Sequence, residues 1–191
     1  MTREQWLAKL TTQLQPLFER AGYTIPTNVR SSCSFPSKSA TSRKRRRIGE
    51  CWTDSASDDG TFEVFVSPTI ADPMRVAGIL AHELAHAAVG LACGHKGEFR
   101  RCAVGIGLTG PMTATGEGEV FTSFVAPLLA RLGAYPHAVL HAGSGAKKQS
   151  TRLVKVACSG CGYTARTTRK WLDDAGSPLC PCNGEPMEFD A

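Results

Sequence analysis

Three histidines and a glutamate lie in an otherwise apolar stretch of the chain, between residues 81 and 95. His82, Glu83 and His86 follow the pattern HExxH, and a third histidine, His95, comes shortly afterwards. Imidazole and carboxylate groups are costly to bury unless a partner compensates them. Residues four apart lie on one face of a helix, so His82 and His86 can bind the same ion. The spacing predicts a metal site, and zinc fits a pair of imidazoles.

Glu83 directly follows the first histidine of the pair, so its carboxylate is expected beside the metal and not on it. A carboxylate at that position can take a proton from a water that zinc has activated, and can then give the proton to a leaving amine. This chemistry is that of a zinc hydrolase with Glu83 as the general base. The alternative is a buried core helix whose histidines bond to backbone carbonyls.

A zinc hydrolase of this kind needs a third protein ligand. His95 is the candidate, because Gly90 can end the helix and let the chain turn back. Cys93 and Glu98 compete with His95, since thiolates and carboxylates also bind zinc.

Tyr135 and His137 lie in the later segment YPHAVLH. One hypothesis is that either residue polarises the carbonyl of a substrate, as the donors of an oxyanion hole do. The other is that His137 is an ordinary, partly buried histidine.

Two pairs of cysteines lie near the C-terminus, and they are Cys158, Cys161, Cys180 and Cys182. A Cys-x-x-Cys pair is a common half of a zinc site. The second pair is Cys-x-Cys, whose shorter spacing leaves open whether Cys182 is a ligand. So short a tail has too little apolar surface to fold unaided, which favours a structural zinc ion on four thiolates.

The remaining cysteines are expected to be small buried thiols, and they are Cys33, Cys51, Cys93 and Cys102. The first ten residues carry charges and no apolar run, so we expect no signal peptide. No stretch approaches the length of a membrane span. We therefore expect a cytoplasmic protein, whose cysteines stay reduced or bind metal.

The chain has a formal net charge of +5. Its densest basic run consists of Arg43, Lys44, Arg45, Arg46 and Arg47. Near the C-terminus, Arg166, Arg169 and Lys170 stand close to Trp171, and such pairs can contact phosphates and stack on bases. Both groups are candidates for binding DNA, and the alternative for both is a solvated surface.

Hydrophobic periodicity predicts helices at residues 2–21, 72–89, 98–104 and 119–133. Alternation of polar and apolar residues predicts strands at 27–35, 48–52 and 61–70. The Gly-rich passage 105–118 is predicted as a loop and 142–151 as a linker. Residues 153–171 are predicted as strand, turn and strand, with the second strand at 163–171.

The HExxH pattern, a Gly-His pair after it and a nearby phenylalanine resemble the SprT/Spartan-like zinc metallopeptidase family. The matching residues are His82, Glu83, His86, Gly94, His95 and Phe99. The order of elements, with cysteine pairs at the C-terminus, is similar to small SprT-like proteins of bacteriophages. The resemblance implies a zincin-like fold, zinc on the three histidines and Glu83 as the base. Members of this group are linked to cleavage of DNA-associated proteins, so the resemblance implies a protein substrate bound to DNA.

The sequence thus predicts an α+β protein in two parts. Residues 1–141 are expected to form a zincin-like metallopeptidase domain, with helices packed on a small sheet and HExxH on a helix. Residues 142–151 are the linker, and 152–191 are expected to form a small zinc ribbon. The alternative is a non-catalytic nucleic-acid-binding module whose zinc sites are both structural. A fourth protein ligand beside the three histidines would favour that alternative.

Overall fold

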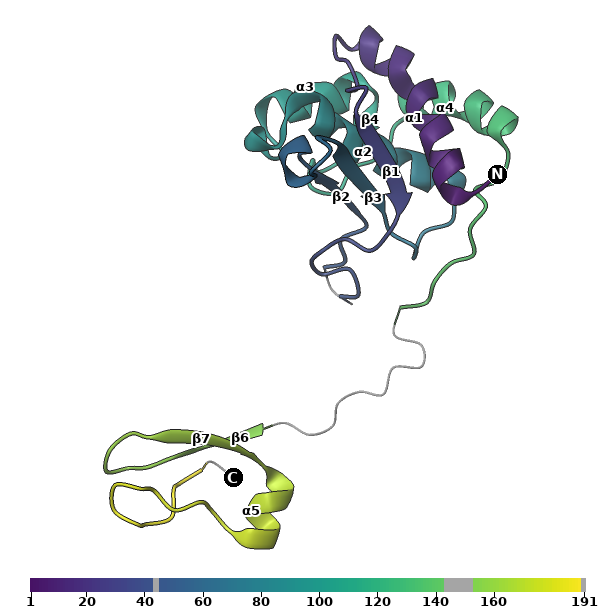
Figure 1. The fold of residues 1–191 in the computed structure, drawn as a ribbon. Coiled ribbons are helices and arrows are strands. Elements are labelled where there is room, and N and C mark those ends of the chain that lie inside the picture. The colour runs from purple at the N-terminus through teal and green to yellow at the C-terminus, as the bar shows by residue number, and fades with distance from the viewer. Residues whose placement is uncertain (43–44, 143–152, 190–191) are drawn as a thin grey trace. The chain divides into compact units, whose positions relative to one another are not determined.

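The computed structural model describes residues 1–42, 45–142 and 153–189 (Figure 1). The chain divides into two compact units, Met1–Ser144 and Gly145–Ala191. Two residues of the basic run, Arg43 and Lys44, lie outside the described residues, as does the predicted linker from residue 143 onward. Each unit combines helices with a small sheet, so the protein is α+β as predicted.

The described residues of the first unit form four α-helices: α1 (Arg3–Arg20), α2 (Pro73–Val89), α3 (Gly97–Gly105) and α4 (Glu119–Leu132). Its strands are β1 (Val29–Cys33), β2 (Gly49–Trp52), β3 (Phe62–Val66), β4 (Leu108–Thr109) and β5 (Gly116–Glu117). Two short 3₁₀ turns, η1 (Asp54–Ala56) and η2 (Leu91–Cys93), complete the unit. The predicted helices and strands are present, and their ends differ by a few residues.

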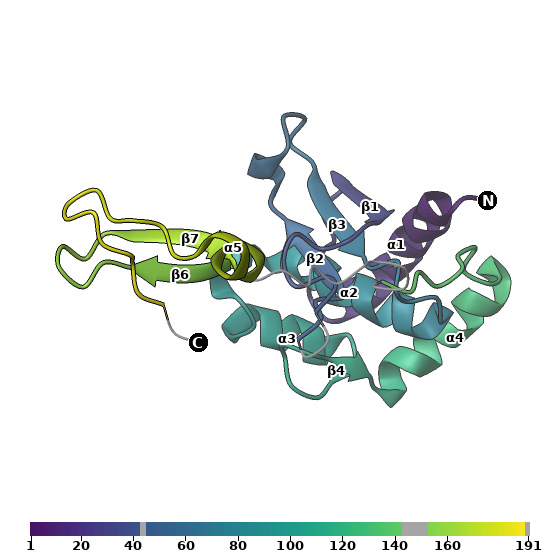
Figure 2. The same ribbon diagram turned by 90° about the horizontal axis from the view of Figure 1, so that it is seen from below.

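The main sheet has the strand order β1-β3-β2, with β1 parallel and β2 antiparallel to β3 (Figure 2). Val64 and Val66 of β3 are fully buried, as the alternation of that segment predicts. The strand β2 is at the edge of the sheet, and no other strand of the described chain pairs with its outer side. An edge strand of this kind has backbone groups that can pair with another extended chain.

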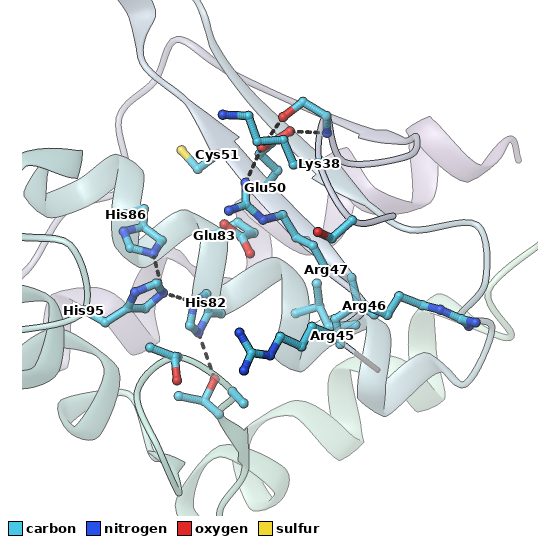
Figure 3. A pocket seen from close by; sticks show the side chains of 18 of the residues that line it. Lys38, Arg45, Arg46, Arg47, Glu50, Cys51, His82, Glu83, His86 and His95 are labelled. Carbon is cyan, nitrogen blue, oxygen red and sulfur yellow. Dashed lines mark hydrogen bonds and ion pairs between the residues drawn. The ribbon is translucent and has the colours of Figure 1, made fainter. Parts of the chain in front are cut away.

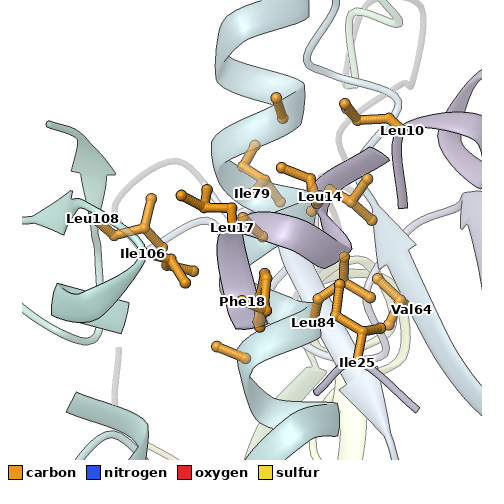
Figure 4. Packing of buried hydrophobic residues seen from close by; sticks show 14 of the residues in the cluster. Leu10, Leu14, Leu17, Phe18, Ile25, Val64, Ile79, Leu84, Ile106 and Leu108 are labelled. Carbon is orange, nitrogen blue, oxygen red and sulfur yellow. The ribbon is translucent and has the colours of Figure 1, made fainter. Parts of the chain in front are cut away.

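The core of the first unit forms where α1 and α2 pack on the sheet and on each other. The buried face of α1 carries the apolar residues that its periodicity predicts: Trp6, Leu7, Leu10, Leu14, Leu17 and Phe18. Figure 4 shows Leu14, Leu17 and Phe18 beside Ile79 and Leu84 of α2. This large core holds the HExxH helix in place from its inner side.

The passage 105–118 was predicted as a loop, and this prediction was incomplete. It contains a two-stranded ladder in which Leu108 pairs with Glu117 and Thr109 pairs with Gly116. Each strand has two residues, too few for sequence alternation to show. The ladder fixes the position of Thr115, which matters for the site below.

The second unit consists of the hairpin β6 (Leu153–Ala157) and β7 (Thr164–Thr168), followed by helix α5 (Arg169–Ala175). The strand predicted over 163–171 ends at Thr168, so the prediction was wrong for residues 169–171, which begin α5. The side chain of Thr168 accepts a hydrogen bond from the Trp171 amide and thereby begins α5. Of the three cations that the sequence places near Trp171, Arg169 and Lys170 therefore lie on a helix, and Arg166 lies in the hairpin.

In the described part of the chain, no helix is both long and apolar enough to cross a lipid bilayer.

Candidate metal centres

The helix α2 begins and ends where its sequence requires. The side chain of Asp72 accepts a hydrogen bond of 2.8 Å from the Arg75 amide, and Pro73 occupies the first helical position. Gly90 ends the helix with a φ of 79°. The chain then turns back through η2 and Gly94, whose φ of 53° and ψ of −126° favour glycine. This turn brings His95 back to the helix.

His82, His86 and His95 come together at the outer face of α2 (Figure 3). The Nε2 atom of His95 lies 3.2 Å from the Nε2 atoms of both His82 and His86. Two imidazole nitrogens bound to one tetrahedral zinc ion at 2.0–2.1 Å are about 3.3–3.4 Å apart. His95 therefore lies at ligand spacing from each of the other two histidines, and the donor atoms of all three lie within 4.8 Å of one another.

Phe99 of α3 forms the floor beneath the imidazoles. Its buried ring stacks on His86 with a centroid separation of 4.1 Å and meets the ring of His82 edge-on at 4.9 Å. The ring keeps water from this side of the cluster and restricts the rotation of both imidazoles. The family resemblance included Phe99, and the structure gives it this physical role.

Thr115 orients His82 from outside the cluster. With the Nε2 atom of His82 directed at the other histidines, its Nδ1–H donates to the Thr115 hydroxyl over 2.9 Å. Such an outer partner selects the tautomer of a metal-binding histidine. Sequence reasoning missed Thr115, because nothing in a Gly-rich passage signals contact with a helix 33 residues away in the chain.

The electrostatics of the cluster favour neutral imidazoles. Burial, followed by repulsion from His86 and His95, lowers the pKa of His82 to about 3. Burial and then His95 lower the pKa of His86 to about 4. Neutral imidazole is the form that binds a metal ion.

Glu83 lies on the same helix with its carboxyl group buried against the same cavity. Burial, as the largest cause, raises the pKa of Glu83 to about 8, while Arg47 acts in the opposite direction. A divalent cation nearby would favour the ionised form. A carboxyl group whose pKa lies near neutrality is suited to proton transfer.

The cluster borders a cavity of about 930 Å³, which Figure 3 shows from close by. His82, Glu83, His86 and His95 form one side of it, and the edge strand β2 contributes to another. The described residues place three donor atoms around the centre of the cluster. A tetrahedral ion held by these three nitrogens would have one coordination position left, which a ligand other than the three histidines would fill.

Of the competing ligands, Cys93 and Glu98 are engaged elsewhere. The Cys93 thiol points to backbone carbonyls at Gly90 and Gly94. The Glu98 carboxylate accepts a hydrogen bond of 3.0 Å from the Tyr23 hydroxyl and pairs with Arg101. Neither belongs to the donor group that contains His95.

Tyr135 and His137 were the candidates for polarising a substrate carbonyl, and the structure places both outside the lining of this cavity. The ring of Tyr135 packs on Trp6 with centroids 4.9 Å apart. His137 accepts from Arg3 at Nδ1 over 3.3 Å and donates from Nε2 to the Pro68 carbonyl over 2.7 Å.

The second unit brings together all four C-terminal cysteines: Cys158, Cys161, Cys180 and Cys182. Their Sγ atoms are 3.7 Å apart for Cys158 and Cys182, and 3.5 Å apart for Cys161 and Cys180. Four thiolates on a tetrahedral zinc ion at 2.3 Å would be about 3.8 Å apart. The Cys-x-Cys spacing thus places Cys182 within reach of the same ion as the others.

Glycines shape both cysteine turns. Gly162 has a φ of 74°, and its amide donates to the Cys158 carbonyl over 2.9 Å. Gly184 has a φ of 72°, and its amide donates to the Cys180 carbonyl over 2.8 Å. Backbone amides that point at Cys158, that of Cys161 above all, lower the pKa of its thiol to about 7. The thiolate is the form that binds metal.

The scattered cysteines were expected to be buried thiols, and this holds for Cys51 and Cys102. Burial raises the pKa of both to about 12. Cys33 and Cys93 are only partly buried.

Comparison of the whole chain with protein-family models, with curated proteins and with solved structures gave no significant match.

Proposed function

We propose that the first unit is a zinc-dependent metalloendopeptidase with a zincin-like fold, of the SprT/Spartan-like kind that its motif residues resemble. One observation carries the proposal: three histidine nitrogens spaced for one ion share a cavity with a buried carboxyl group. A purely structural site has no use for an acid in that place, whereas hydrolysis requires a proton acceptor there.

In this proposal His82, His86 and His95 hold the ion, and Thr115 and Phe99 fix the orientation of the imidazoles. When bound, zinc supplies a water of lowered pKa and polarises a carbonyl group. Glu83 accepts the proton of the attacking water and delivers it to the amine that leaves. Water adds across the peptide bond, and a carboxylate and a protonated amine are formed.

The edge strand β2 supports a polypeptide as the substrate. It lies along the cavity, and no strand of the described chain pairs with its outer side. An extended polypeptide can add to such an edge through backbone hydrogen bonds. This mode of binding would hold a peptide bond beside the histidines largely irrespective of sequence.

The second unit is proposed to be a zinc ribbon whose ion is structural. Thiolates in a tetrahedral set of four are typical of zinc or of iron–sulfur centres, and the fourfold thiolate set leaves no position for substrate. The unit has a small core: Val156, Cys158, Leu172, Cys180 and Met187. An ion would add the stability that this core cannot supply.

A second candidate function, nucleic-acid binding, is favoured by one surface of the second unit. Lys155 and Arg166 are directly opposite each other in the hairpin, and both are exposed. Like charges in such a position repel unless an anion compensates them. Exposed Trp171 and Tyr163 offer ring faces on which bases can stack. DNA held there would bring DNA-associated proteins to the peptidase unit.

The peptidase proposal is tested with Glu83→Gln in the full chain loaded with zinc. Loss of the base should lower the rate of cleavage of an unfolded test protein by about 10²–10⁴-fold. Both zinc ions should remain, since their ligands are unchanged. Glu119→Gln is the matched control, because this exposed glutamate lies at the start of α4 outside the cavity. Equal rates for the two variants would contradict the proposal.

A further inference from the structure

The cavity beside the three histidines has a basic wall. Its cations are Lys38, Arg45, Arg46, Arg47 and Arg75. Among the described residues that line it, Glu50 and Glu83 are the only carboxylates. Figure 3 shows Arg45, Arg46 and Arg47 on the side of the pocket opposite His86 and His95.

Glu50 of β2 anchors the loop between β1 and β2, which carries all of these cations except Arg75. Its carboxylate accepts hydrogen bonds from the Ser37 amide at 2.7 Å and the Ser37 hydroxyl at 2.8 Å. Arg47 donates to it over 2.5 Å, and the Trp52 indole donates over 3.1 Å. Burial opposes ionisation of Glu50, but these four donors together lower its pKa. One buried carboxylate therefore ties both ends of the loop to the edge strand.

Two of the five cations are neutralised by acids of the chain itself. Arg47 pairs with Glu50. Arg75 pairs with Glu117 over 2.6 Å and also donates to the Thr115 carbonyl over 2.9 Å. The other three cations, Lys38, Arg45 and Arg46, are exposed, and no acid of the described chain lies within ion-pair distance of them.

We propose that Lys38, Arg45 and Arg46 form a substrate subsite that selects polypeptide segments with acidic side chains next to the bond cleaved. The inference rests on the proposed function and narrows its substrate class. Three cations that have no acidic partner among the described residues line the same cavity as the donor cluster, and they attract negative charge to the place of reaction. The same wall repels basic segments, so selection works in both directions.

The position of the cations favours a polypeptide over nucleic acid as the occupant. They line the same cavity of about 930 Å³ as the three histidines and Glu83, where a substrate of the proposed peptidase would bind. The edge of β2 in the same cavity offers backbone groups that pair with an extended polypeptide. Acidic side chains of such a polypeptide can reach the wall while its backbone follows the edge strand.

Binding without cleavage provides the first test. The full-length, zinc-loaded Glu83→Gln protein is titrated against a fluorescein-labelled peptide in which an apolar dipeptide is flanked by glutamates. The reference peptide has glutamines instead. An exposed ion pair changes affinity by up to about fivefold, so the acidic peptide should bind more tightly at low salt, by up to about fivefold for each ion pair that it forms. The difference should shrink as salt is raised.

Adding Arg45→Ala and Arg46→Ala to the Glu83→Gln protein should remove most of this preference. The affinity for the glutamine peptide should stay within about twofold of that of the Glu83→Gln protein, because only exposed charges are lost. Lys9→Ala with Arg131→Ala is the matched control, since it removes the same charge from exposed positions outside the cavity. Equal binding of the two peptides, or an equal loss in the control, would overturn the subsite.

Cleavage of the same two peptides by the protein with Glu83 intact separates this inference from the proposed function. Cleavage of both peptides at equal kcat/KM would keep the peptidase and overturn the subsite. Charge-selective binding without cleavage of any peptide would keep the subsite and contradict the peptidase. If a single-stranded oligonucleotide displaces the acidic peptide, and Arg45→Ala with Arg46→Ala weakens only the oligonucleotide, the cations serve nucleic acid and the inference is overturned.

Discussion

In the first unit three imidazoles meet at the side of a cavity, next to a buried carboxyl group and above a large hydrophobic core. In the second unit four thiols meet one another, and two of them belong to the small core itself. Three donors would leave one coordination position of a tetrahedral ion open, whereas four donors would fill all of its positions. The comparison teaches that the number of donors and the surroundings of an ion distinguish a site for chemistry from a site for folding.

The largest difference is expected when metal is removed. Chelation should unfold the second unit, because structural zinc in small thiolate sites contributes about 10–16 kcal/mol of folding free energy. The first unit should stay folded on its own core. Hydrogen exchange of the full chain, measured peptide by peptide, would show loss of protection within 153–189 alone. If protection within 153–189 is unchanged after both ions are shown to be lost, the second unit does not depend on its ion for folding, and the contrast between the two sites fails.

A smaller effect is expected from Gly49→Ala, which tests the carboxyl group without touching a ligand. A Cβ atom at Gly49 would overlap the Glu83 carboxyl group and come within 2.7 Å of Cγ2 of Ile79. Displacement of the carboxyl should lower the cleavage rate by up to about 10²-fold, with metal content unchanged. Gly116→Ala is the control, because its Cβ would meet nothing within 4 Å. A full rate in Gly49→Ala would argue against Glu83 as the base.

Thr115→Val should affect the histidine site and leave the cysteine site intact. It removes the acceptor of the His82 Nδ1–H, and the loss of such a partner costs about 10–100-fold in metal affinity. Thr115→Ser keeps the hydroxyl and should keep the affinity. Competition with a chromophoric chelator measures both ions. If Val and Ser behave alike, Thr115 does not orient the ligand.

The smallest effect is expected on DNA binding by the second unit. Lys155→Ala with Arg166→Ala should reduce the slope of log affinity against log salt by up to about 1.8, at roughly 0.9 per phosphate contact. Arg45→Ala with Arg46→Ala removes the same charge from the cavity wall and should change the slope less. The opposite order would assign DNA to the first unit, and no binding of DNA at low salt would remove the nucleic-acid role altogether.

Both donor clusters could be predicted because their residues are close in sequence. His82 and His86 are one helical turn apart, and Asp72, Pro73 and Gly90 mark the ends of that helix. The cysteine pairs behave in the same way, since each forms within a single tight turn. Local spacing and backbone preference suffice for such groups, because they need little information from the rest of the chain.

The surroundings of the clusters required the tertiary structure. Thr115 reaches His82 only because a two-residue ladder, too short for periodicity, positions its loop. Tyr135 and His137 looked equally suited to the site by residue type, yet packing on Trp6 and Arg3 places them elsewhere. Contacts of this kind join distant segments, and no local pattern encodes them.

The sequence by itself determined the two donor sets, the helix that carries HExxH and the division into two parts, because short-range geometry governs all three. The tertiary structure decided which residues surround the histidines. The basic run was visible in the sequence as charge alone, with a DNA surface as its candidate role. Only the fold tied its loop to Glu50 and brought Arg45 and Arg46 to the wall of the cavity, since long-range packing determines where a charge lies.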